Sequence, residues 1–416
     1  MFRVALSPTG DMHIETLRVA LLNYICAAQA GEPLIVRIED IDKERTIEGK
    51  EHAMLDMLSL FGISYTQLYY QSSNFKYHLQ FASTLLDKKK AFICFCKKES
   101  QDKAYRYDGT CENLSSDAVL NNPNPFVIRM KKPAKTFSFN DKIKGAMRFE
   151  PDDIDSFVIM SADKYPTNTF ACACDDMLQG VTTIIREEKH LLNTPKEELI
   201  RQSLGYDQAI NYAHIPVMLY AKEDETLSAQ YLLDQGFMPE AILNYLVLLG
   251  YDTPTEIFTL EETISWFDIT RLSKSSVHFD MDKLRFINRE HIKRIPDMEL
   301  SKRLGYACDK IGKLAKLYTE EVSTTYEIKQ KIDALFAKKA FYAEFEHESK
   351  LLQELILSAP YMENFDTFQS YLLEKSGLKE NAFFKPLRFW LSGVDQGPEL
   401  ALLYPLIKHY LKEIVR

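Results

Sequence analysis

The hydrophobic pattern at the N-terminus predicts a strand, a helix and a second strand. Residues 2–6 form a short apolar run, and turn-forming residues follow at positions 7–10. Apolar side chains then recur with a helical period over residues 12–30, before an almost uninterrupted apolar run at residues 34–38. Such a unit places two parallel strands in a sheet that is covered on both faces. We therefore expect an α/β domain whose ligand site lies beyond the carboxyl ends of these strands.

Polar side chains follow both predicted strands and are expected at that rim. They are Ser7, Thr9, His13, Glu39, Asp40 and Asp42. No glycine-rich phosphate loop follows either strand, so a phosphate ligand would need other groups. His13 stands at the start of the predicted helix, where unpaired backbone N–H groups suit a triphosphate and an imidazole N–H can donate to its oxygens. Taken alone, a histidine at a helix start is more often structural than functional.

The hydrophobic pattern of the chain changes twice after this unit. Helical periodicity continues near residues 46–61 and 75–90, whereas residues 92–160 hold short alternating runs separated by Asn, Pro and Gly. These runs predict a small mixed α+β insertion. Strand-like runs resume at 169–174, 182–185 and 213–219, and helical periodicity dominates beyond residue 230. We expect one interrupted α/β domain followed by helical domains.

The composition supports a folded protein with several domains. Hydrophobic residues make up 46% and charged residues 27% of the 416 positions, which excludes a disordered or fibrous chain. At about 150 residues per domain, the length predicts two or three domains. The balance of 51 Lys and Arg against 60 Asp and Glu gives a net charge of −9. This charge argues against coating nucleic acid through overall charge but allows a local basic strip.

Compartment and targeting can also be predicted. Seven cysteines are too few for a disulfide framework in a chain of this length. The N-terminus has no cationic segment followed by an apolar run, and no stretch approaches ~18 consecutive apolar residues. We therefore expect a cytoplasmic protein with no signal peptide and no membrane span.

Two motifs near the N-terminus carry a resemblance to a known family. The stretch Arg3-Val-Ala-Leu-Ser-Pro-Thr-Gly-Asp-Met-His13, followed by Arg37-Ile-Glu-Asp-Ile-Asp42, resembles the start of bacterial glutamyl-tRNA synthetases. Further landmarks follow in the family's order along the whole chain. They are Tyr69-Tyr-Gln71, Arg106-Tyr-Asp-Gly109, Phe170-Ala-Cys-Ala-Cys-Asp-Asp176, Ile185-Arg186, His190-Leu-Leu-Asn-Thr-Pro195, Tyr212-Ala-His-Ile-Pro216, the segment 236–246, Phe279-Asp-Met-Asp-Lys-Leu284 and Phe384-Lys-Pro-Leu-Arg388. Colinear motifs at this density identify the chain as a member of that family.

The resemblance implies an architecture and a reaction. Residues 1–91 and 166–230 correspond to a class I catalytic domain of Rossmann type, and residues 92–165 to a connective insertion that grips the acceptor end of tRNA. Residues 231–290 correspond to a stem-contact region, and residues 291–416 to an all-α anticodon-binding domain. The family activates L-glutamate with ATP and Mg²⁺ and transfers it to the terminal adenosine of tRNA, usually as a monomer.

Matching positions also imply the functional residues. Those for glutamate are Arg3, Ser7, Glu39 and Arg186, with Asn168 at the position of a substrate-facing tyrosine. An arginine fork suits a carboxylate, and a glutamate suits an α-ammonium group. Those around ATP and its metal are Thr9, His13, Asp42 and Glu188, of which His13 is also a candidate catalytic residue. Those for tRNA are Lys274, Lys283, Arg285 and Arg388. Residues 274–294 carry six bases and three acids, and this charge of 6 − 3 = +3 suits phosphate contacts, although a mixed-charge helix face is an equal alternative.

The departures from the family pattern fall where the chemistry is expected. The family's His-x-Gly signature, whose glycine lets ATP lie close to the backbone, reads His13-Ile-Glu15 here. An unscreened carboxylate would repel a phosphate by ~1–4 kcal/mol at ~4 Å. The other changes are Leu6 for proline, Asn168 for tyrosine, Glu187 for glycine and Lys189 for an acid.

The second family signature, a Lys-Met-Ser-Lys-Ser loop that neutralises the phosphates as pyrophosphate leaves, is not found where it is expected. Between Pro216 and Gly236 the match to the following helix leaves only residues 221–226 in its place, so we interpret the loop as deleted. Lys222 is the nearby cation and a candidate catalytic replacement. The similar sequence at 272–276 matches the stem-contact region and is assigned to tRNA backbone contact.

Three functional hypotheses remain open at this level. The chain is an active glutamate–tRNA ligase in which Lys222 or Lys189 replaces the lost lysines, or it is a tRNA-binding paralogue with weak or no charging activity. A third hypothesis is a truncated relative that glutamylates a modified tRNA base, but the helical half beyond residue 290 argues against it. No motif distinguishes tRNA-Glu from tRNA-Gln.

Three cysteines match the family's zinc site in the insertion. Cys94 and Cys96 are followed by Cys111, but the expected fourth ligand is Asn113, a poor donor. Glu112, Asp117 or a water would have to complete the site. The alternative is three packed or solvated thiols. Cys172 and Cys174 are expected to alternate along a buried strand.

Overall fold

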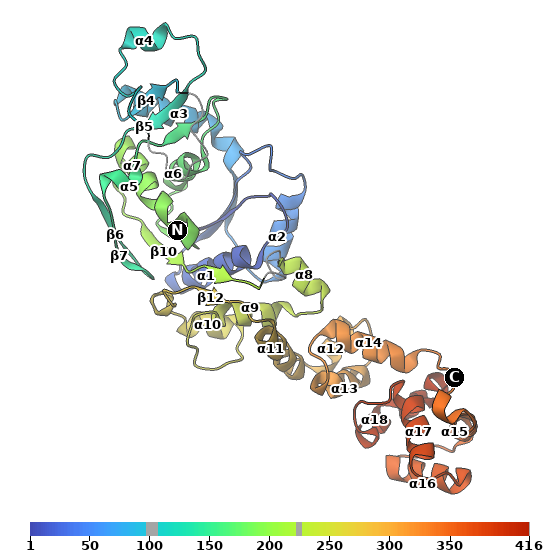
Figure 1. Ribbon diagram of the computed structural model, residues 1–416. Coiled ribbons are helices and arrows are strands. Elements are labelled where there is room, and N and C mark those ends of the chain that lie inside the picture. Colours follow the sequence, from blue (N-terminus) through green and yellow to red (C-terminus); the bar gives the residue numbers. More distant parts are fainter. Residues whose placement is uncertain (97–106, 222–226, 416) are drawn as a thin grey trace. The chain divides into compact units, whose positions relative to one another are not determined.

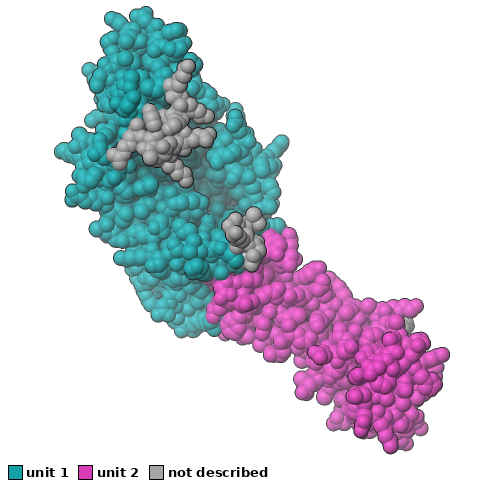
Figure 2. All heavy atoms as spheres, in the orientation of Figure 1, with its two compact units in different colours: residues 1–230, 246–279 teal, residues 231–245, 280–416 magenta. Residues whose placement is uncertain are grey.

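The computed structural model describes residues 1–96, 107–221 and 227–415 (Figure 1). Its chain forms two compact units, one of residues 1–230 and 246–279 and the other of residues 231–245 and 280–416 (Figure 2). The predicted stem-contact region 231–290 is therefore divided between the two units.

Unit 1 is built on a seven-stranded sheet with the order β3-β2-β1-β9-β10-β6-β7. The strands from β3 to β10 run parallel, and β6 and β7 form an antiparallel hairpin at the edge. The bounds are β1 Phe2–Leu6, β2 Leu34–Ile38, β3 Gln67–Tyr70, β6 Phe137–Asp141, β7 Gly145–Phe149, β9 Thr183–Glu187 and β10 Asn211–Ile215. The predicted strand–helix–strand unit is confirmed. Because β1 has β2 on one side and β9 on the other, a ligand crevice is expected at their carboxyl ends.

Helix α1 (Ile14–Ala30) connects β1 to β2 and packs against the sheet. Leu17, Leu21 and Ile25 have no exposed surface and form its buried stripe. Asn23, also buried, donates from its side-chain nitrogen to the carbonyl of Ile185 at 3.0 Å, which ties α1 to β9. The helix ends at Gly31, whose φ of 63° lies in the left-handed region that glycine adopts without strain.

One predicted strand of unit 1 is a helix. The run 169–174, which carries Cys172 and Cys174, lies in α6 (Asn168–Leu178). Residues from Phe170 to Asp176 are all buried, so the segment shows no amphipathic period that would distinguish a helix from a strand. The remaining principal helices of unit 1 are α2 (Lys50–Leu60), α3 (Phe75–Asp87), α7 (Thr194–Leu204) and α10 (Leu260–Trp266).

The described part of the predicted insertion belongs to two sheets. Its strands β4 (Ala91–Cys94), β5 (Val127–Met130) and β8 (Val158–Met160) form a small antiparallel sheet. The β6–β7 hairpin instead extends the large sheet, because Tyr212 of β10 pairs with Asp141 of β6. The insertion is thus mixed α+β, as predicted, and it also contributes to the sheet that carries the cleft.

Every regular element within unit 2 is helical in the part of the chain that the structure describes, in agreement with the predicted periodicity. Its principal helices are α11 (Met281–Arg294), α12 (Asp297–Arg303), α13 (Asp309–Leu317), α14 (Thr325–Phe336), α15 (Glu346–Ser358), α16 (Phe365–Ser376), α17 (Asn381–Ser392) and α18 (Leu400–Ile407). α12 and α13 pack so closely that a Cβ at Gly312 would lie 1.8 Å from the Asp297 carbonyl oxygen. Among the described residues of both units, no helix is long and apolar enough to cross a membrane.

Candidate active site

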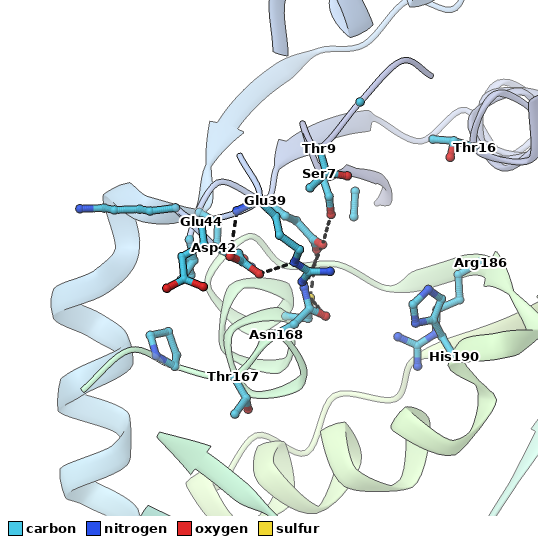
Figure 3. A pocket seen from close by; sticks show the side chains of 18 of the residues that line it. Ser7, Thr9, Thr16, Glu39, Asp42, Glu44, Thr167, Asn168, Arg186 and His190 are labelled. Atoms are coloured by element: carbon cyan, nitrogen blue, oxygen red, sulfur yellow. Dashed lines mark hydrogen bonds and ion pairs between the residues drawn. The ribbon is translucent and has the colours of Figure 1, made fainter. Parts of the chain in front are cut away.

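A cleft of about 1050 Å³ opens at the carboxyl ends of β1, β2 and β9 (Figure 3). Most of the residues that the sequence predicted for substrates line it. They are Arg3, Ser7, Thr9, His13, Glu39, Asp42, Asn168 and Arg186. Lys222, the predicted replacement for the lost loop, lies outside the described residues. The topology therefore gathers groups from distant parts of the chain at the rim where the parallel strands end.

His13 is the N-cap of α1. Its Nδ1 accepts the backbone N–H of Glu15 at 3.3 Å, so a neutral ring carries its proton on Nε2. The ring contacts Tyr220 edge-on, with centroids 5.3 Å apart. Since His13 lines the cleft, Nε2 is the ring's donor for an anionic ligand there.

Glu39 is surrounded by donors at the end of β2. Its Oε2 accepts hydrogen bonds from Asn168 Nδ2 at 3.0 Å and Ser7 Oγ at 3.3 Å (Figure 3). Its Oε1 accepts the Cys172 thiol at 3.0 Å, and the Arg37 guanidinium lies 3.7 Å away. These contacts fix the carboxylate in the cleft, where it can accept further hydrogen bonds from an ammonium group.

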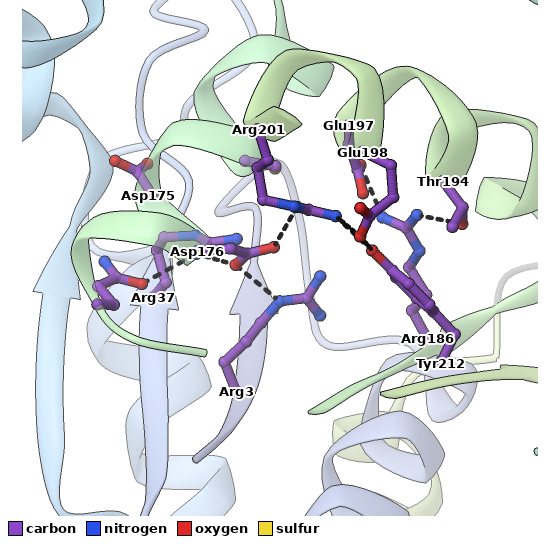
Figure 4. Close-up of polar contacts among 12 residues, drawn as sticks. Arg3, Arg37, Asp175, Asp176, Arg186, Thr194, Glu197, Glu198, Arg201 and Tyr212 are labelled. Carbon is purple, nitrogen blue, oxygen red and sulfur yellow. Dashed lines mark hydrogen bonds and ion pairs between the residues drawn. The ribbon is translucent and has the colours of Figure 1, made fainter. Parts of the chain in front are cut away.

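A buried ion cluster lies beneath the cleft (Figure 4). Asp176 of α6 accepts from Arg37 at 2.7 Å and Arg3 at 3.4 Å, and Arg201 is 4.0 Å away. Burial opposes ionisation of this carboxyl, but Arg37, Arg3 and Arg201 outweigh it and hold the pKa of Asp176 well below its ordinary range. Arg3 is bound to the cluster through Nε, which leaves its terminal nitrogens toward the cleft that it lines.

Arg186 is oriented by a second buried network. It donates from NH1 to Glu197 at 2.8 Å, from NH2 to Thr194 at 2.8 Å and from Nε to His214 at 3.3 Å. His214 is itself held by Asp141, whose carboxylate lies 2.6 Å from Nδ1, so Nε2 is the acceptor that faces both Arg186 and the Thr194 hydroxyl, which is 3.0 Å away. Three of the five guanidinium N–H groups are thereby used, and two remain for a ligand in the cleft.

The segment after β9 departs from the expected arrangement. Glu187, Lys189 and His190 line the cleft, whereas Glu188 is not part of its lining and pairs with Lys144 at 2.7 Å. The strand alternation ends at Glu187 and a 3₁₀ helix (Glu188–Asn193) begins, which turns Glu188 away. Its predicted contact with ATP stays a prediction that this geometry does not favour.

The four predicted tRNA contacts differ in the groups of the protein that they already contact. Lys274 is exposed beside the β6–β7 hairpin, where Lys144 donates to its carbonyl at 2.6 Å. Within unit 2, Arg285 pairs with Glu327 at 2.9 Å, and Arg388 donates to the carbonyls of residues 397 and 398. Lys283 lies over the Phe286 ring. Arg285 and Arg388 are thus already engaged in holding unit 2 together, and RNA contact remains a prediction for all four.

The three cysteines of the insertion converge with a tyrosine that the sequence reasoning did not include. The thiols of Cys94, Cys96 and Cys111 lie within 4.8 Å of one another. The Tyr107 hydroxyl lies 3.7 Å from Cys94 Sγ and accepts the N–H of Cys111 at 2.7 Å, whereas Glu112 faces Lys131. Three sulfurs and one oxygen are a donor set that fits tetrahedral zinc, so these residues could hold the ion.

The electrostatics of the cluster agree with metal binding. Burial opposes ionisation of Cys94, but hydrogen bonds from the Cys96 backbone, Arg129 and Tyr107 lower its pKa. Burial, with Cys111 and Cys94 as neighbours, raises the pKa of Cys96 to about 12. Burial and neighbouring thiols oppose the ionisation of Cys96, and a bound cation would offset this because it stabilises all the thiolates at once.

The fold, the cleft and the rim residues define a class I aminoacyl-tRNA synthetase catalytic domain. The family described as "tRNA synthetases class I (E and Q), catalytic domain" matches residues 1–286. "Glutamate--tRNA ligase 1" of Campylobacter jejuni is 52% identical and "Glutamate--tRNA ligase 2" of Sulfurimonas denitrificans 47% identical, each over 100% of both chains. The chain therefore belongs to the glutamate–tRNA ligase family of class I synthetases.

A solved structure agrees with this fold. The crystal structure of a glutamate tRNA ligase from Elizabethkingia meningosepticum superimposes with a TM-score of 0.83 at 23% identity, covering 100% of this chain and 97% of that one. The full-length matches argue against the truncated-relative hypothesis.

We predict that Asp176→Asn lowers the stability of unit 1 by ~3–5 kcal/mol, because it leaves buried arginines without their anion. Asp309→Asn, which breaks an exposed pair with Lys313, is the control and should change stability by less than ~1 kcal/mol. Thermal and urea unfolding measure both.

The same substitution should change the acid response. The pKa of Asp176 is lower folded than unfolded, so its stabilisation is complete above the unfolded pKa and is lost as pH falls through the folded one. Asp176→Asn should lose less of its remaining stability on acidification than the wild type. Equal stability of the two proteins at pH 7 would contradict the role of this cluster.

We predict that the reduced protein binds one zinc ion and that Tyr107→Phe weakens its retention at least ~10-fold in chelator competition. Cys111→Ser should abolish stoichiometric binding, and Tyr206→Phe, which changes a half-buried tyrosine bonded to Gln208, is the matched control. Elemental analysis and chelator titration provide the measurements. Zinc retention by Tyr107→Phe equal to that of the wild type would exclude the phenol as a ligand.

Proposed function

We propose that the chain charges tRNA with L-glutamate in an ATP-dependent reaction whose activation step is slow. The observation that carries this proposal is one group of side chains on the cleft, in which two guanidinium groups, Arg3 and Arg186, accompany the carboxylate of Glu39. This pattern complements a dicarboxylic amino acid, whose two carboxylates need cations and whose ammonium group needs an anion. Relatives 52% identical over their full length carry the name glutamate–tRNA ligase, which supports the same substrate.

The reaction has two steps. A carboxylate oxygen of glutamate attacks the α-phosphorus of ATP, the bond from this phosphorus to its β-bridging oxygen breaks, and pyrophosphate leaves. The terminal adenosine hydroxyl of tRNA then attacks the acyl carbon and AMP leaves. We assign His13 Nε2 and the N-terminus of α1 to the phosphate oxygens, and Glu39 to the substrate ammonium group.

Magnesium belongs to this proposal as the partner of ATP. It supplies positive charge to the phosphate oxygens as pyrophosphate leaves. Asp42 is the candidate carboxylate on the cleft, although Arg45 already pairs with it at 2.6 Å. We expect a single chain acting in the cytoplasm, with tRNA-Glu or tRNA-Gln as the RNA.

The departures in the nucleotide half support a slow activation step. Glu15 stands where the family has glycine, and only residues 221–226 stand in place of the lysine loop. The match to the Campylobacter relative extends over 432 positions against 416 residues here, a difference of 432 − 416 = 16. These 16 positions of the match have no counterpart in this chain, which agrees with a segment lost somewhere along it.

The same departures favour a second candidate, a tRNA-binding paralogue that no longer charges tRNA. Lys189, itself one of the altered positions, is a cation on the cleft, and it is already paired with Glu187 at 2.5 Å. A cation engaged in this way is less available to a departing pyrophosphate. The two candidates differ only in whether product forms.

A charging assay with labelled glutamate, run beside filter binding of tRNA, tests both candidates. We expect slow, ATP-dependent formation of glutamyl-tRNA. Glu39→Gln should lower kcat/KM for glutamate ~30-fold or more, because it removes the anion that faces the ammonium group. Glu44→Gln, an exposed carboxylate on the same cleft, should leave it unchanged.

The outcomes separate the candidates. Glutamyl-tRNA that forms with the wild type and not with Glu39→Gln supports the ligase. Binding of tRNA without any product supports the silent paralogue. Absence of both would contradict the assignment of tRNA as a partner.

A further inference from the structure

A small cavity of about 90 Å³ adjoins the cleft and is not explained by the glutamate half of the site. It lies between the first turn of α1, the end of β9 and the segment 215–218 that leads into β11 (Met218–Leu219). Val19, Glu187 and Lys189 line both the cavity and the cleft, so the two adjoin. The cavity therefore extends the cleft on the side where the nucleotide is expected.

The side chain of Glu15 faces this cavity and not the main cleft. Its Oε1 accepts the backbone N–H of Met218 at 3.3 Å, a contact across 203 positions of sequence. Glu15 is half-buried, and burial together with neighbouring Glu187 raises its pKa, against His13 and Lys189, which lower it. The chain thus places a carboxylate where solvation is poor, and a backbone hydrogen bond holds it there.

Aromatic side chains lie next to His13 and Met218, beside this cavity. The Tyr220 ring contacts His13 edge-on and stacks obliquely near Phe279, with centroids 5.9 Å apart. Its hydroxyl reaches the Met218 sulfur at 3.0 Å. The backbone donor of Met218 and the aromatic surface beside it are both occupied by the chain itself.

This arrangement has a consequence for a purine base. The ring nitrogens of adenine are hydrogen-bond acceptors, as is the Glu15 carboxylate, so both compete for the same backbone N–H. A base that entered this part of the cleft would have to displace the Glu15 side chain and leave a carboxylate near the phosphates. Glycine at this position would offer neither obstacle.

We propose that Glu15 is an internal ligand of the nucleobase subsite, which must release Met218 before ATP can bind and thereby sets the affinity for ATP. The inference rests on the proposed function because it takes ATP as the ligand of this cleft. It assigns to one side chain a specificity-determining role that makes nucleotide entry conditional on a local rearrangement.

Calorimetric titration of the full chain with Mg–ATP, without glutamate or tRNA, tests this role. Glu15→Ala and Glu15→Gly should each lower the Kd for ATP at least ~10-fold. Alanine is the best helix former, so Glu15→Ala keeps the first turn of α1 intact if glycine weakens it. Glu44→Ala is the matched control, since it removes an exposed carboxylate from the cleft but not from the cavity.

Glu15→Gln distinguishes the effect of occupying the Met218 N–H from the effect of the negative charge of Glu15. Its amide oxygen can still accept the Met218 N–H, so we expect a gain of less than ~3-fold. A gain as large as that of Glu15→Ala would show that the charge alone matters and would overturn the internal-ligand role. GTP should bind the wild type no better than ATP, and a clear preference for GTP would mean that Glu15 recognises a base instead of displacing one.

Failure of the inference and failure of the proposed function can be told apart. An unchanged Kd in Glu15→Ala, or no ATP binding by either protein, would overturn the role of Glu15 even if glutamyl-tRNA forms. A lower Kd in Glu15→Ala supports that role even if no glutamyl-tRNA forms. Unfolding temperatures of all variants confirm that the folded chains are being compared.

Discussion

The active-site end of unit 1 depends on one buried charge, Asp176. This carboxylate lies on α6 and is contacted by Arg3 from β1, Arg37 from β2 and Arg201 from α7. Buried charges are tolerated only where opposite charges and hydrogen bonds compensate the loss of water. The cluster therefore couples the packing of two strands and two helices to the position of Arg3 at the cleft.

The part of the cleft that we assign to glutamate differs from the part that we assign to the nucleotide. In the proposed glutamate half, Arg3, Arg186 and Glu39 each have at least one buried partner, which reduces the reorganisation that substrate binding requires. In the nucleotide half, Glu15 and Tyr220 fill space around the backbone donor of Met218. If the cleft binds the proposed substrates, preorganisation favours the amino acid, whereas the nucleotide competes with the protein's own groups.

This asymmetry gives a physical basis for the relation between the chain and its family. Similarity at 52% identity over the full length supports the proposed reaction, and three altered positions, Glu15, Glu187 and Lys189, line the cavity that we assign to the nucleotide. A slow ligase and a silent tRNA-binding paralogue would share the same fold and the same cleft. They would differ in how many cations remain to bind the phosphates of ATP and in how much space remains for the nucleotide.

The sequence alone determined the strand–helix–strand start and the helical half, and most of the substrate residues that it predicted do line the cleft. Local periodicity and ordered motifs are recorded within short stretches, so they can be read before folding. It did not determine that residues 169–174 are helical, since burial on all sides erases the period that distinguishes helix from strand. The convergence of Tyr107 with three thiols, the turning of Glu188 toward Lys144 and the contact of Glu15 with Met218 were decided by tertiary structure. Each of these depends on chain segments that meet only after folding, so no local pattern could encode their geometry.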